Sequence, residues 1–279
     1  MRSVRFKQVD VFTRVPFSGN PVAVVLEGAG LGTADMQRIA AWTNLSETTF
    51  VLPPTTAAAD YLLRIFTPRA ELPFAGHPTI GSAHAVLEAG IVTAKAGKLR
   101  QECGAGILDL EVEGDTLWLD SPRATHTEFS ESQVLEKILN TKAKGTPLIM
   151  NVGPRWLVAE LADAKAVAAI VPDMPALAEL SNRLSIGGVT VYGAANDGVS
   201  GVHVRSFAPA HGIPEDPVCG SGNISVAAYV RKSGRFGDGY VARQGMQLGR
   251  DGRVSIRFEG DKILLGGAAV TCIEGTLSV

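Results

Sequence analysis

Four side chains with catalytic chemistry stand in short motifs at separate points of the sequence: Glu47, His77, Asp216 and Ser221. A carboxyl group partly withdrawn from water has a raised pKa, so it can remove a proton from carbon near neutral pH and then return it. Glu47, between an expected helix end and an expected buried strand, is our candidate for this general acid/base. The alternative is a structural carboxylate that accepts hydrogen bonds from nearby amides.

His77 and Ser221 each follow a glycine, Gly76 and Gly220, at an expected helix start. The helix dipole disfavours a charged imidazole there, and a neutral ring can donate or accept a hydrogen bond. A structural ring bonded to a loop carbonyl is the alternative for His77. Together with Asp216 these residues have the types of a hydrolase triad, but no nucleophile-elbow sequence surrounds Ser221, so acyl transfer is not favoured.

Two similar helices are expected to position these groups. The first begins near Gly76, is rich in small and apolar residues and ends at Gly90; the second begins near Gly220 and ends at Gly234. When the two glycines that begin the helices are superposed, the closing glycines also align. Upstream of the helices, Arg64 aligns with Arg205 if the second copy has a three-residue insertion. We interpret this as an internal duplication; the alternative is chance similarity among Gly, Ala and Val.

Helix starts carry amide groups without intrahelical partners, so they can bind an anion such as a carboxylate. We therefore expect the two starts to face one cleft that holds a small anionic metabolite. The residues expected to bind it are Gly76, Cys219, Gly220, Ser221 and Gly222, and the residues expected to be catalytic are Glu47, His77 and Asp216.

Cys219 supports a second chemistry. A thiol at a helix start is expected to have a lowered pKa, which favours the reactive thiolate. A racemase with two thiol bases would need a second cysteine in the other copy, and the duplication places Ala75 there. The sequence thus contains one half of a cysteine pair.

No metal or nucleotide cofactor is expected. His77 and His84 are seven residues apart on one helical face, but no third ligand has a suitable spacing. The run from Gly28 resembles a dinucleotide loop, yet Thr33 occupies the place of its third glycine, which favours a linker.

Composition favours an ordinary folded protein. The chain has 279 residues, 46% hydrophobic and 19% charged, with a net charge of -2 and no basic stripe, so neither nucleic acid nor an anionic membrane is an expected partner. Three cysteines suit a reducing compartment better than a disulfide framework. With no apolar signal core and no apolar run of the ~20 residues a spanning helix needs, we expect a cytoplasmic protein.

Many strand-like segments accompany one apolar helix in each half, which is typical of an α+β fold. The turn-rich segment 120–125 suggests a domain junction. We therefore expect two pseudo-symmetric lobes, residues 1–121 and 122–279. The last strand of a duplicated fold can cross back to the first lobe.

Three motifs resemble the signatures of the phenazine-biosynthesis isomerase (PhzF-like) family, which shares the diaminopimelate epimerase fold. They are Asn44–Thr48, Phe74–Gly81 and Glu215–Ser221. The resemblance runs along essentially the whole chain. It implies lobes that are each a bent, mostly antiparallel, barrel-like sheet around a central helix, with the site between them, no cofactor and a homodimer.

The resemblance also implies roles for single residues. Glu47 would transfer the proton, and His77, Asp216 and Ser221 would shape the site and hold the substrate. Cys219 departs from the threonine often found in that motif and resembles the second catalytic cysteine of epimerases and proline racemases, whereas Ala75 departs from their first.

The function favoured by the sequence is a cofactor-independent isomerase that moves a proton on a small carboxylate-bearing metabolite, related to the isomerase of phenazine biosynthesis. One alternative is an epimerase or racemase that uses Cys219 with Glu47 as the opposed base. Another is a family member without catalytic activity that binds a ligand or a protein.

Overall fold

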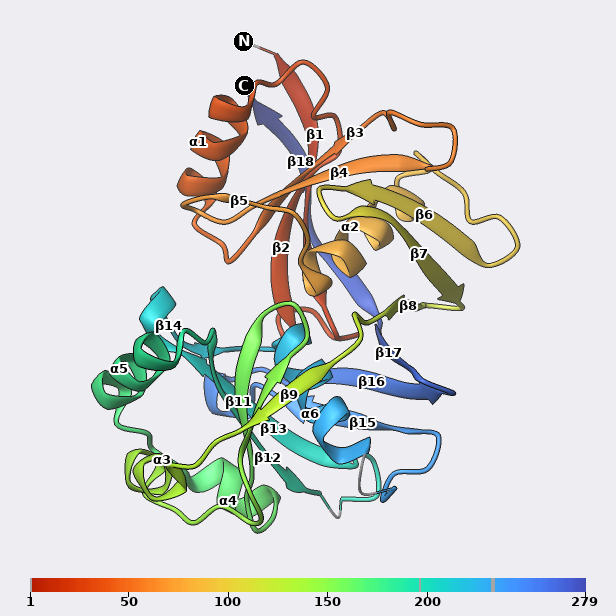
Figure 1. The fold of residues 1–279 in the computed structure, drawn as a ribbon. Coiled ribbons are helices and arrows are strands. Elements are labelled where there is room, and N and C mark those ends of the chain that lie inside the picture. The colour runs from red at the N-terminus through yellow and green to blue at the C-terminus, as the bar shows by residue number, and fades with distance from the viewer. Residues whose placement is uncertain (1, 196, 232–233) are drawn as a thin grey trace. The chain divides into compact units, whose positions relative to one another are not determined.

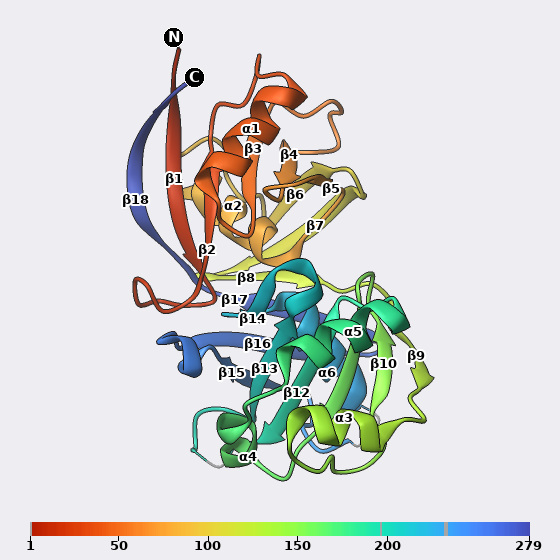
Figure 2. The same cartoon turned by 90° about the vertical axis from the view of Figure 1, so that its left-hand side faces the viewer.

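The computed structural model describes residues 2–195, 197–231 and 234–279. The chain divides into two compact units: Met1–Leu119 with Gly266–Val279, and Asp120–Leu265. In each unit a curled sheet, with mostly antiparallel strand pairs, packs around one apolar helix (Figures 1 and 2). The α+β class with a bent sheet around a helix in each lobe is thereby confirmed.

The first unit contains strands from both ends of the chain. Its strand β1 pairs antiparallel with β2 on one side and with β18, the last strand, on the other. The pairs β2–β3 and β4–β6 are parallel, and β3–β4, β6–β7 and β7–β8 are antiparallel. The elements are β1 (Ser3–Val11), β2 (Asn20–Val25), α1 (Thr33–Thr43), β3 (Thr48–Leu52), β4 (Tyr61–Phe66), β5 (Glu71–Leu72), α2 (Gly76–Glu88), β6 (Lys98–Cys103), β7 (Gly106–Glu113), β8 (Thr116–Asp120) and β18 (Ala269–Ser278).

Helix α2 is the centre of this unit. It packs against β1, β2, β3, β4 and β18, and most of its residues are buried, which explains its lack of charge in the first turns. A Cβ atom at Gly81 would lie 2.5 Å from Val22 Cγ1, so only glycine lets the helix approach β2 this closely. The buried hydroxyl of Ser82 is satisfied by Thr49 Oγ1 at 2.8 Å.

The second unit has the same plan around α6 and adds three helices. Strands β11 and β12 are parallel, and the pairs β9–β10, β10–β11, β12–β13 and β15–β16 are antiparallel. The elements are β9 (Thr125–Glu128), α3 (Ser132–Leu139), β10 (Leu148–Asn151), β11 (Arg155–Glu160), α4 (Ala164–Ala169), α5 (Met174–Leu184), β12 (Gly188–Ala194), β13 (Val202–Ala208), η1 (Pro209–His211), β14 (Ile213–Asp216), α6 (Gly220–Arg231), β15 (Gly239–Gln244), η2 (Met246–Leu248), β16 (Gly252–Glu259) and β17 (Lys262–Gly267), whose end passes into the first unit.

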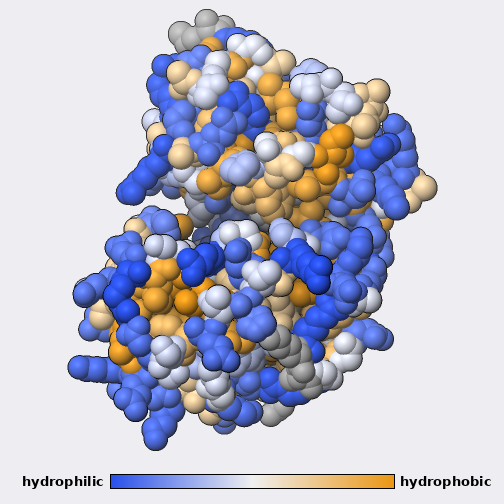
Figure 3. Space-filling view, in the orientation of Figure 1, coloured by the Kyte–Doolittle hydropathy of each residue, from blue (hydrophilic) through white to orange (hydrophobic). Residues whose placement is uncertain are grey.

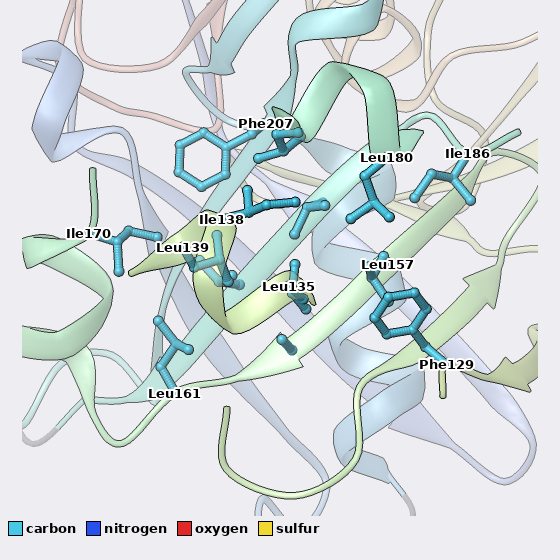
Figure 4. Packing of buried hydrophobic residues seen from close by; sticks show 14 of the residues in the cluster. Phe129, Leu135, Ile138, Leu139, Leu157, Leu161, Ile170, Leu180, Ile186 and Phe207 are labelled. Atoms are coloured by element: carbon cyan, nitrogen blue, oxygen red, sulfur yellow. The ribbon is translucent and has the colours of Figure 1, made fainter. Parts of the chain in front are cut away.

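Alternating side chains divide this sheet into two faces. On one face Leu157, Val189 and Phe207 join a hydrophobic core with α3, α4 and α5 (Figure 4). The residues next to these along each strand point to the other face, and Trp156 and Ser206 are among them. Helix α6 packs against this second face. The start of α6 therefore rests on a face that offers polar side chains.

Arg64 and Arg205, which the duplication aligns, make similar contacts in the two halves. The Arg64 guanidinium donates two hydrogen bonds to Glu71, both 2.7 Å, and lies over the Phe66 ring. Arg205 donates to Glu215 at 2.9 and 2.8 Å and lies over Phe207. The second pair is the more deeply buried.

Two helix starts differ in how they are capped. The N-cap of α1 is Gly32 and not the neighbouring Thr33, whose hydroxyl accepts a hydrogen bond from Arg64. The short helix α4 has only six residues, too few to show a helical period in the sequence. Its start is capped by Asp163, whose carboxylate accepts the Ala166 amide hydrogen.

Hydrophilic residues cover most of the face seen in Figure 3, and hydrophobic residues gather on it in smaller patches. Within the described ranges of the chain, no helix has both the length and the apolar character needed to cross a bilayer.

Candidate active-site residues

Glu47 and His77 lie together in the first unit. The chain leaves α1 through Asn44, whose φ of 54° turns it sharply, and Glu47 directly precedes β3. The Glu47 carbonyl accepts the Ala23 amide hydrogen at 3.3 Å, which ties this segment to β2. His77 occupies the first turn of α2, next to Gly76. Its Nε2 lies 3.4 Å from Glu47 Oε2, and the two side chains are only 10% and 15% exposed.

The His77 ring is neutral at pH 7. Burial lowers its pKa to about 4, although a hydrogen bond to the Pro21 carbonyl acts in the opposite direction. Among the described residues Nε2 has no hydrogen-bond partner, so the nitrogen that donates to Pro21 is Nδ1. A neutral ring carries one N–H, so Nε2 is unprotonated and lies beside the Glu47 carboxyl group.

In the second unit the start of α6 gathers Asp216, Cys219, Gly220, Ser221 and Gly222. The Gly222 amide donates to Cys219 Sγ at 3.3 Å. A Cβ atom at Gly222 would lie 2.5 Å from Ser206 Oγ, so glycine is required for α6 to begin this close to the sheet. Ser221 is half-buried, and its Oγ accepts a hydrogen bond from Trp156 Nε1 at 3.0 Å.

Asp216 is an acid that titrates close to neutral pH. Burial raises its pKa to about 6, and the negative charge of Glu215 adds to this effect. Two hydrogen bonds act in the opposite direction: the Val218 amide donates to Oδ1 at 3.0 Å, and the Cys219 side chain also contributes. A carboxyl group with this pKa can exchange protons under physiological conditions.

The expected low pKa of Cys219 is wrong. Burial and the negative charge of Asp216 raise the thiol pKa well above its usual value. Hydrogen bonds from the Gly222 amide and from Ser221 and Ser206 lower it, but they do not offset the burial. The helix start is present as expected, yet loss of water and a neighbouring carboxylate have the larger effect, so the thiol is protonated at neutral pH.

Gln244 holds this segment in place and was not among the expected residues. It is fully buried on β15, and its Oε1 accepts hydrogen bonds from the Cys219 amide at 3.2 Å and from Asn223 Nδ2 at 2.8 Å. Its Nε2 donates to the Asp216 carbonyl at 3.0 Å. The first unit has a similar glutamine, Gln101, that donates to Thr79 on α2 at 3.1 Å.

The expected residues thus form one group in each unit. Glu47, His77 and Gly76 belong to the first, and the residues from Asp216 to Gly222 belong to the second. The first group offers a carboxyl group beside a neutral imidazole. The second offers a titratable acid, a hydroxyl group and a helix start.

Comparisons with known proteins agree on one family. A family model described as phenazine biosynthesis-like protein (PhzC-PhzF) matches residues 9–275. The trans-2,3-dihydro-3-hydroxyanthranilate isomerase of Pseudomonas fluorescens is 36% identical and covers 96% of this chain and 97% of its own. A Schizosaccharomyces pombe protein named antisense-enhancing sequence 1 is 41% identical over 97% of each chain.

Solved structures give the same result. The PhzF-family protein of Enterococcus faecalis superposes with a TM-score of 0.86 at 29% identity, covering all of both chains. A probable proline racemase of Agrobacterium radiobacter has a TM-score of 0.69 at 14% identity, covering 99% of this chain and 93% of its own, and shares the fold alone.

Proposed function

This chain belongs to the phenazine biosynthesis-like (PhzC-PhzF) family of isomerases, and we propose that it catalyses a proton-transfer isomerisation without a cofactor. In this proposal Glu47 removes a proton from a carbon atom of a small carboxylate-bearing metabolite and delivers it to another carbon atom. His77 acts beside Glu47, and Asp216 and Ser221 hold the substrate.

The approach of His77 Nε2 to Glu47 Oε2 is the observation that carries the proposal. Because Nδ1 donates to Pro21 and the ring is neutral, a hydrogen atom between Nε2 and the carboxyl group has to come from Glu47. The imidazole lone pair can therefore accept a hydrogen bond from the protonated carboxyl group. This stabilises the form of Glu47 that exists after it has taken a proton from carbon, which a residue acting first as base and then as acid requires.

The start of α6 supports a carboxylate-bearing substrate. The helix dipole and the Ser221 hydroxyl group both favour an anion there. Trans-2,3-dihydro-3-hydroxyanthranilate, the compound in the name of the Pseudomonas fluorescens relative, carries such a group and is the first substrate to test.

The thiol chemistry of a racemase is less well supported. Cys219 is protonated because its pKa is raised well above the usual value. Ala75 stands at the aligned position before α2, where a racemase with two thiols would have a second cysteine. These two features favour Glu47 over Cys219 as the base.

The test is incorporation of deuterium from heavy water into the substrate, followed by mass spectrometry and proton NMR. The wild-type protein, treated with a chelator and dialysed, is expected to convert the dihydro-hydroxyanthranilate with one deuterium incorporated at the carbon that is reprotonated. Glu47→Gln keeps the shape of the side chain but removes the exchangeable acid, so we expect it to fold and bind ligand while exchange falls by about 10²-fold or more.

Glu179→Gln is the matched control, because Glu179 is exposed on α5 and distant in sequence from the motifs. It should exchange at the wild-type rate. Undiminished exchange in the Glu47 variant would refute the mechanism.

A further inference from the structure

The Trp156 indole makes a single directed contact with the start of α6: its Nε1–H donates to Ser221 Oγ at 3.0 Å. We propose that Trp156 is a positioning residue that sets the direction in which the Ser221 hydroxyl group donates its hydrogen. The proposal rests on the function above in one respect, namely that Ser221 binds the substrate carboxylate.

The indole can do this because its own position is fixed. Trp156 lies on β11 between Met150 of β10 and Gly188 of β12, and it is only 5% exposed. A Cβ atom at Gly188 would lie 2.9 Å from Trp156 Cζ3, so the ring lies against the backbone of that glycine. A buried ring packed on a central strand keeps its rotamer, and its N–H keeps one direction.

The chemistry of the two groups then determines the polarity of the contact. An indole N–H can only donate, so Ser221 Oγ must accept, and its own hydrogen has to point elsewhere. Within the described chain the other polar neighbour of Oγ is Cys219 Sγ, at 3.7 Å. Sulfur is a weak acceptor, and this sulfur already accepts the Gly222 amide hydrogen.

A carboxylate at the start of α6 is a much stronger acceptor than the thiol, so it takes the Ser221 hydrogen. Without the indole N–H, the hydroxyl group would be free to rotate, and part of the time its lone pair rather than its hydrogen would face the anion. Trp156 thus lets Ser221 act as a donor whose direction is set before the ligand arrives.

A double-mutant cycle tests the coupling. Trp156→Phe keeps a large aromatic ring and removes the N–H, and Ser221→Ala removes the group that the N–H orients. With 3-hydroxyanthranilate as the probe and calorimetry as the measurement, we expect Trp156→Phe to weaken binding about fivefold in the wild-type background. In the Ser221→Ala background it should have no further effect.

Trp118→Phe is the matched control, since the Trp118 indole donates to Glu113 at 2.9 Å in the other unit. It should bind the probe as the wild type does. Equal weakening by Trp156→Phe in both backgrounds would mean that the indole acts only through packing, and this would overturn the proposal, as would no weakening at all.

A second measurement observes the hydrogen bond itself. In a nitrogen–proton NMR spectrum the indole signal of Trp156, assigned by its absence in Trp156→Phe or by contacts to neighbours, should move upfield in Ser221→Ala while those of Trp42 and Trp118 stay in place. An unmoved signal contradicts the hydrogen bond.

The catalytic proposal and the role of Trp156 can fail separately. If deuterium exchange is unchanged in Glu47→Gln but the double-mutant cycle shows the expected coupling, only the catalytic proposal is refuted. A wild-type protein that does not bind the probe would overturn the role of Trp156.

Discussion

His77 Nε2 and Glu47 Oε2 lie 3.4 Å apart, and the ring hydrogen is on the opposite nitrogen, donated to the Pro21 carbonyl. The imidazole beside the carboxyl group is therefore neutral, and its unprotonated nitrogen is the one nearer Glu47. An imidazolium would hold Glu47 as a carboxylate by ion pairing, whereas a neutral acceptor favours the protonated acid.

Replacing His77 by asparagine separates the roles of the two ring nitrogens. An asparagine side chain can place its amide N–H where Nδ1–H stands, so His77→Asn should keep the hydrogen bond to Pro21 while it loses the lone pair near Glu47. We expect a free energy of unfolding within about 1 kcal/mol of the wild type and at least tenfold slower deuterium exchange. His77→Ala, which loses both contacts, should be slow and less stable. Wild-type exchange in His77→Asn would remove Nε2 from the mechanism.

The second prediction concerns stability against pH. The pKa of Asp216 is about 6 in the folded protein and 3.8 as the ordinary value, so between these pH values the folded state binds more protons than the unfolded state. Stability from this group is therefore fully present below pH 3.8 and is lost as the pH rises through 6. Asp216→Asn should then be more stable than the wild type at pH 7, by on the order of 2 kcal/mol, with the difference vanishing near pH 4.

His77 has the opposite effect over a similar range. Its pKa is about 4 in the folded protein against an ordinary 6.5, so the unfolded state binds more protons and stability rises with pH between these values. In Asp216→Asn this rise is no longer opposed, and urea titrations from pH 4 to 7.5 should show a steeper increase than in the wild type. A constant offset between the two proteins at all pH values would contradict the ionisation of Asp216.

The third prediction concerns Cys219. Because the thiol is buried and protonated, iodoacetamide at pH 7 should label the partly exposed Cys272 before Cys219 or Cys103, as read by peptide mass spectrometry. Cys219→Ser should retain deuterium exchange within about tenfold of the wild type. Abolished exchange with intact binding of 3-hydroxyanthranilate would instead establish thiol chemistry.

The fourth prediction compares the ion pairs formed by the aligned residues Arg64 and Arg205. Arg205 and Glu215 are 7% and 8% exposed, whereas Arg64 and Glu71 are 24% and 39% exposed. Arg205→Met leaves a buried carboxylate without its partner and should cost about 3–5 kcal/mol in free energy of unfolding. Arg64→Met leaves the Glu71 carboxylate partly exposed to water and should lower the free energy of unfolding by about 1 kcal/mol or less. Equal costs in urea titrations would show that burial does not distinguish the two pairs.

The sequence by itself determined the fold class, the family and the local positions of the candidate residues. Helices that begin at Gly76 and Gly220, with small residues and almost no charge, could only be central, and the structure has them there. These features depend on neighbours in the sequence: which residue begins a helix, how often apolar residues recur, and which motif follows which strand.

The tertiary structure decided what depends on residues distant in the sequence. The hydrogen bond to the Pro21 carbonyl determines which nitrogen of His77 carries the ring hydrogen. Burial raises the pKa of both the Cys219 thiol and the Asp216 carboxyl group near the start of α6. Sequence reasoning applied the helix dipole to Cys219 and obtained the wrong direction, because the dipole is a local effect and desolvation is not.

Gln244 and Trp156 were missed for the same reason. Each is an ordinary strand residue in the sequence, and each acquires a role because the sheet brings its polar group against the start of α6. A side chain's hydrogen-bond partners follow from which face of a strand it occupies and what packs on that face, and only the folded chain determines both.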